Sequence, residues 1–179
     1  MKRPLVRASL VILLVVACGL IYHGARTHGF SARKKPNAVE AFLAKNIRRF
    51  VVPYGTKARK NPLVADPILV AEARDHFADH CAGCHANDGS GRTDIGQNLY
   101  PPAPDMRSGY TQELTDGELF YIIKEGIRLS GMPGWGGEDE ENWKLVLFIR
   151  HLPHLSAEEI ELMREVNKLE SPEGIGFRP

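Results

Sequence analysis

The apolar residues of the chain recur at helical spacing, and no segment alternates apolar and polar residues as a strand does. Residues 38–50 show this spacing clearly, with Lys45, Arg48 and Arg49 between the apolar positions. The same spacing predicts a helix that begins near Asp66 and further helices over 115–126, 138–152 and 156–169. We therefore expect an all-α fold.

Residues that favour helix ends mark several of these boundaries. Asp66 suits an N-cap, Pro67 suits the first helical position, and Gly126 suits a C-terminal stop. Two helices begin with capping-box spacing, Thr115 with Glu118 and Ser156 with Glu159. The segments 86–110 and 127–137 are rich in Gly, Asp and Pro, and we expect both to be loops.

An apolar run follows three basic residues at the start of the chain, which is typical of a secretory signal or a membrane anchor. We assign residues 1–25 to a signal-anchor or signal peptide. The run has no clear small-x-small cleavage site, which favours a retained anchor. Cleavage stays open, as does lipidation of Cys18, because "VVAC" resembles the lipobox of bacterial lipoproteins. Basic residues on both sides of the run leave its orientation open.

Charge is distributed unevenly, although the formal net charge is only +1. Nine Lys or Arg and one acid lie between Arg33 and Lys60, and we interpret 26–65 as a basic linker with a short helix. That helix is expected to lie on a membrane surface or to pack on the domain or a partner. Residues 66–152 form the predicted domain and 153–179 a helical tail. The low net charge argues against nucleic acid as a partner.

The sequence Cys-Ala-Gly-Cys-His at 81–85 carries the most specific chemistry. Two thiols three positions apart can bond to the two vinyl groups of one haem, and the adjacent histidine can then ligate its iron. Zinc would need a fourth ligand, and a thiol-redox pair would be expected after a strand. We therefore expect Cys81 and Cys84 to hold one covalent haem c and His85 to be an axial ligand.

The sixth iron ligand is expected from "SGMPGWG", where Met132 lies 47 residues after His85 between Gly and Pro. A methionine outside any helix is harder to explain as packing than Met106, which lies in the longer loop. The free ring N–H of His85 should donate to a loop carbonyl, for which the candidates are Pro101, Pro102 and Pro104. Tyr100 and Trp135 are expected to pack on the macrocycle rather than to bind a propionate.

Four motifs in order, "CAGCHANDGSG", "LYPPAPDM", "LFYIIKEGIRLSGMPGWG" and "NWKLVLFIRHL", make the chain resemble a class I c-type cytochrome. Within that class, it is similar to the haem-bearing subunits of cb-type oxidases. The resemblance covers about Asp66 to Leu152 and implies a cytochrome c fold around one haem, with His85 and Met132 on the iron. Two positions depart from the family, because Ala73 and Ala86 stand where it often has glycine.

The resemblance implies a single-haem electron-transfer protein rather than an enzyme. It would pass single electrons between respiratory-chain partners, either as a carrier or as a subunit of a complex. The alternative is an open-site haem enzyme or sensor of peroxidase-like type, in which Met132 is not bound. Because haem is attached to such motifs outside the cytoplasm, we expect a membrane-anchored chain with its cytochrome domain in the periplasm.

Overall fold

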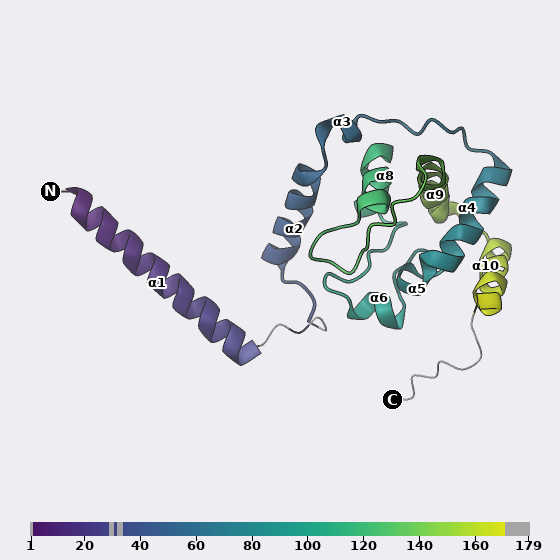
Figure 1. Cartoon of the computed structure of the whole chain (residues 1–179). Coiled ribbons are helices and arrows are strands. Elements are labelled where there is room, and N and C mark those ends of the chain that lie inside the picture. The colour runs from purple at the N-terminus through teal and green to yellow at the C-terminus, as the bar shows by residue number, and fades with distance from the viewer. Residues whose placement is uncertain (1, 29–30, 32–33, 171–179) are drawn as a thin grey trace. The chain divides into compact units, whose positions relative to one another are not determined.

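The computed structural model describes residues 2–28, 31 and 34–170 (Figure 1). The chain divides into two compact units, Met1–Lys34 and Lys35–Pro179. Every regular element in the described residues is a helix, which confirms the all-α prediction.

The first unit consists of one helix, α1 (Lys2–His28). Its segment Val6–Thr27 is long and apolar enough to cross a membrane, since 22 residues extend about 33 Å against a hydrocarbon core of about 30 Å. The apolar side chains along it are exposed within the unit, and Cys18 is a free, exposed cysteine. These features suit either a membrane anchor or a signal sequence.

The second unit contains the remaining helices. In chain order these are α2 (Ala38–Val51), α3 (Tyr54–Lys57), α4 (Pro67–His80), α5 (Ala82–His85), α6 (Asp94–Asn98), α7 (Gly109–Gln112), α8 (Asp116–Glu125), α9 (Asp139–His151), η1 (Leu152–His154) and α10 (Ala157–Glu170). Helix α4 packs most extensively on α9 and also contacts α10, so that it lies between them (Figure 1). Helix α8 packs on α9 and on α3.

Apolar side chains from α4 and α9 form the centre of the core. Phe77 and Phe148 are fully buried, and their ring centroids lie 5.1 Å apart. Ala73 is buried one turn before Phe77. Its small side chain allows two helices to approach closely, so the departure from glycine at this position does not disturb the packing.

The predicted helix ends are confirmed at Asp66, at Gly126 and at both capping boxes. The predicted 86–110 loop is wrong in part, because α6 and the start of α7 lie within it. Thr93 caps α6 by accepting a hydrogen bond from the Gly96 N–H at 2.8 Å. Helices this short have too few turns to show a hydrophobic period.

Part of the basic segment before α4 is held against α8 and α9. The Thr115 hydroxyl donates to the Lys57 carbonyl at 3.0 Å, and the Asn61 side-chain amide donates to the Trp143 carbonyl at 2.9 Å. The Arg59 guanidinium lies 4.4 Å from the centroid of the Phe120 ring. These contacts make the end of this segment part of the packed unit rather than a free linker.

Helix α10 covers the outer side of α4. Met163 is fully buried in this contact, and the Asn167 side-chain amide donates to the Ala78 carbonyl at 2.6 Å. At the start of α10, Glu159 lies 2.7 Å from the His151 ring. Residues 171–179 of the predicted tail lie outside the described residues.

Candidate haem-attachment site

The Cys-x-x-Cys-His sequence forms a single helical turn directly after α4. Cys81 ends α4, where its N–H donates to the Phe77 carbonyl at 2.9 Å, and it also begins α5. The His85 N–H donates to the Cys81 carbonyl at 2.9 Å, which closes the turn. Both cysteines are half-buried and His85 is buried. The three residues therefore lie together on one rigid turn.

The environment of His85 suits a neutral metal ligand. Burial lowers the pKa of its imidazole to about 4, so the ring is uncharged near neutral pH and keeps a nitrogen lone pair. Its Nδ1 is buried and has no hydrogen-bond partner, so the expected bond to a proline carbonyl is not formed. Proteins rarely leave a buried polar atom unsatisfied. Such a ring fits a site that is completed by a bound group.

The environment of the Cys81 thiol does not favour the reactive thiolate of a redox pair. Burial, with smaller effects from Cys84 and Asp79, raises the pKa of the Cys81 thiol to about 12. A thiol-disulfide enzyme needs a lowered pKa instead. Both cysteines are free. Zinc gains no support either, because no three His, Cys, Asp or Glu side chains of the described chain gather as a metal site.

The chain after His85 folds back closely onto the turn. The Gly91 N–H donates to the His85 carbonyl at 2.8 Å. A Cβ atom on Gly91 would lie 2.4 Å from the Ala103 carbonyl oxygen. A Cβ atom on Gly96 would lie 2.1 Å from the Cys84 carbonyl oxygen. Only glycine fits at these two positions. The loop and α6 thus form a tight wall around the cysteine turn.

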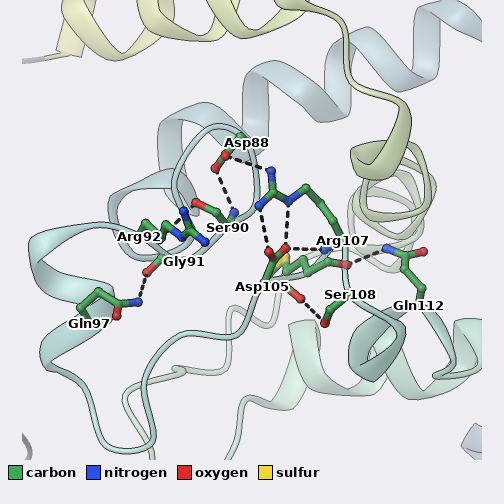
Figure 2. Close-up of polar contacts among 10 residues, drawn as sticks. Asp88, Ser90, Gly91, Arg92, Gln97, Asp105, Arg107, Ser108 and Gln112 are labelled. Carbon is green, nitrogen blue, oxygen red and sulfur yellow. Dashed lines mark hydrogen bonds and ion pairs between the residues drawn. The ribbon is translucent and has the colours of Figure 1, made fainter. Parts of the chain in front are cut away.

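An ion-pair network fixes this wall, as Figure 2 shows. Arg107 donates to both carboxylate oxygens of Asp105, at 2.9 and 2.8 Å, and to Asp88 at 3.1 Å. The Arg107 hydrogen bond is the main reason why the pKa of Asp105 is lowered. Asp88 also accepts from the Ser90 N–H at 2.9 Å. Sequence reasoning missed this network, because its members are ordinary loop residues that lie up to 19 positions apart.

The loop that carries Met132 is pinned to the end of α8. The Met132 carbonyl accepts from the Ile127 N–H at 3.1 Å, and the Met132 N–H donates to the Ser130 hydroxyl at the same distance. A Cβ on Gly126 would lie 2.4 Å from the Gly134 nitrogen, so the loop folds directly against this glycine. Met132 is half-buried.

An aromatic contact brings the methionine loop to the cysteine turn. The Trp135 ring packs edge-on against the His80 ring, with centroids 5.6 Å apart, and His80 directly precedes Cys81. Tyr100 instead donates its hydroxyl to Glu40 at 3.0 Å. The two segments that carry the expected iron ligands are therefore neighbours in the fold, although 47 residues separate His85 from Met132.

The other loop methionine has a different environment. Met106 is buried in the apolar core, where its N–H donates to the Gly89 carbonyl at 2.8 Å and its carbonyl accepts from the Gln112 amide at 2.7 Å. Its position is explained by packing and by backbone hydrogen bonds. Met132, in contrast, is half-buried and does not belong to the buried apolar core.

The all-α fold and the cysteine turn beside a methionine loop are those of a class I c-type cytochrome domain, a class that binds haem and carries out haem-based electron transfer. Residues 69–149 match the family described as cytochrome C oxidase, cbb3-type, subunit III. The domain thus resembles the cytochrome domains of cbb3-type oxidase subunits. A comparison with curated proteins found no match.

Proposed function

We propose that this chain is a single-haem c-type cytochrome that transfers single electrons between respiratory-chain partners. In this proposal Cys81 and Cys84 would attach the haem c covalently, and His85 and Met132 would be the ligands of its iron. The observation that supports this most strongly is the contact of Trp135 with His80, because it holds the methionine loop beside the cysteine turn.

The protein's contribution is to fix the backbone that carries both ligands and to bury His85. Haem c, when bound, supplies a one-electron iron couple, and histidine–methionine ligation raises its potential. The turn after α4 presents a neutral His85, and the hydrogen bonds of the 127–136 loop hold the backbone of Met132. If His85 and Met132 both bind the iron, these side chains would leave it no open site for a substrate. Electron transfer is then the activity that remains.

Absorption spectroscopy on Met132 variants tests the ligand assignment. The full chain, produced in a bacterium that attaches haem c, should show the long-wavelength Met–iron band when oxidised. Met132→Ala should lose the band, have a lower potential and bind cyanide faster. Met106→Leu is the matched control and should keep the band, since Met106 packs in the core. A wild-type protein that lacks the band and binds cyanide rapidly would favour the open-site enzyme or sensor.

We further propose that α1 remains as a membrane anchor and that the cytochrome domain faces the periplasm. The length and apolar surface of α1 support this, as does the attachment of haem to such motifs outside the cytoplasm. Docking to redox partners would use small, weak contacts steered by charge. The intact mass of the purified chain tests whether residues 1–25 are retained, cleaved or lipidated at Cys18.

Purification from native membranes in mild detergent distinguishes the carrier from the subunit. A subunit should migrate with other chains of an oxidoreductase complex, whereas a carrier should elute alone. The family match to an oxidase subunit supports the first result.

A further inference from the structure

Helix α2 presents apolar side chains that nothing in the described structure covers. Four of them are 51–66% exposed, namely Val39, Phe42, Leu43 and Ile47. The other described side chains of α2 up to Ile47 are exposed as well. Soluble surfaces rarely gather apolar side chains in this way unless another phase or molecule covers them.

The helix is nevertheless well formed at its start. Asn37 caps it by accepting from the N–H groups of Val39 and Glu40, at 3.0 and 2.9 Å, and Glu40 completes the capping box. Glu40 also accepts the hydrogen bond from Tyr100 of the cytochrome domain. The exposed apolar side chains therefore belong to an ordered helix with a fixed contact to the domain.

The pattern of the helix divides it into two sides. Positions 39, 42, 43 and 47 fall along one side by helical spacing, while Ala41 falls on the opposite side. The sequence of α2 also contains Lys45, Arg48 and Arg49 against a single acid. A helix that is apolar on one side and carries a net positive charge suits the surface of an anionic membrane.

The position of α2 in the chain favours lipid over a protein partner. Nine residues separate it from α1, and they can span at most about 30 Å. If α1 crosses the bilayer, α2 must begin within that distance of the point where α1 leaves it. The sequence directly before α2 adds three further basic residues, Arg33, Lys34 and Lys35.

We propose that α2 lies in the interface of an anionic membrane, with Val39, Phe42, Leu43 and Ile47 at the boundary of the acyl chains. This inference rests on the proposed anchoring by α1. The Tyr100–Glu40 hydrogen bond would then hold the cytochrome domain at the bilayer surface.

Spin-label accessibility in vesicles tests the proposal. The full-length holoprotein with Cys18→Ser is labelled at Phe42→Cys or, as the matched control, at Ala41→Cys. Vesicles contain phosphatidylcholine with phosphatidylglycerol. The ratio of collision rates with oxygen and with a water-soluble nickel chelate should be severalfold higher at position 42 than at 41. Vesicles of phosphatidylcholine alone should reduce that difference severalfold.

A label at Leu13→Cys in α1 reports on the anchor, and the haem spectrum of each sample reports on haem attachment. If positions 41 and 42 are equally open to the nickel chelate while Leu13 is shielded, the proposal for α2 is overturned and the anchor stands. The α2 proposal would also be overturned if position 42 were shielded in native membranes but not in the lipid vesicles, because the apolar side of α2 would then bind a protein. A Leu13 label open to the chelate would overturn both the anchor and the α2 proposal.

Discussion

Replacing Ala86 by glycine should stabilise the protein. Ala86 directly follows His85 and has φ 60° and ψ 156°, a region of backbone conformation that is nearly exclusive to glycine. Holding another residue there costs about 1–3 kcal/mol. Glycine removes this strain, but it adds about 0.4–1 kcal/mol of unfolded-state entropy and removes a half-buried methyl worth about 0.4 kcal/mol. The net gain should be about 1 kcal/mol.

Chemical and thermal unfolding of the holoprotein in one detergent measure this gain. For a folded unit of this size, about 1 kcal/mol corresponds to an increase in Tm of about 2–4 °C. Ala71→Gly is the matched control, since Ala71 lies in the regular interior of α4. The same chemical change there should lower stability by about 0.5–1 kcal/mol.

Opposite signs for the two variants would establish that the backbone at position 86 is strained. If Ala86→Gly were neutral, or as destabilising as Ala71→Gly, the backbone at position 86 would not be strained.

Three further variants test other contacts. Gly126→Ala places a methyl 2.4 Å from the Gly134 nitrogen, so it should displace the methionine loop and weaken the Met–iron band in absorption spectra. Gly117→Ala places a methyl group 1.8 Å from the Thr56 carbonyl oxygen, and it should lower the free energy of unfolding by about 1–3 kcal/mol, as measured by urea titration. Burial opposes ionisation of Glu159, but hydrogen bonds from the start of α10 and from a neighbouring histidine outweigh it and lower its pKa. The Glu159 carboxylate therefore contributes stability above the ordinary glutamate pKa, and this contribution is lost as the pH falls through the lowered pKa of the folded state. Glu159→Gln should remove this pH dependence, so that stability falls less steeply with pH on the acid side.

The elements that sequence reasoning located were those with strong local signals. Helices α4 and α8 are identified by apolar residues that repeat at helical spacing and by end residues such as Asp66, Thr115 and Gly126. Both signals can be read in the sequence because they involve only a few neighbouring positions. The cysteine turn is recognisable for the same reason. Its chemistry is encoded in five consecutive residues.

The contacts that sequence reasoning missed link distant positions. Arg107 pairs with Asp88 across 19 residues, and the Trp135 ring meets His80 across 55. Such pairs depend on how loops fold back on helices, and no local sequence pattern predicts this folding. The His85 Nδ1 is the reverse case, because sequence reasoning expected it to bond to a carbonyl of a distant loop, and in the structure it has no partner.

Mass spectrometry of the exported full-length chain under denaturing conditions tests the central claim most directly. Thioether bonds survive denaturation, so the chain should be heavier than its polypeptide by the mass of one haem. A variant with Cys81→Ser and Cys84→Ser should have the mass of the polypeptide alone. A wild-type chain without the added mass, produced where a known c-type cytochrome is correctly made, would contradict the assignment.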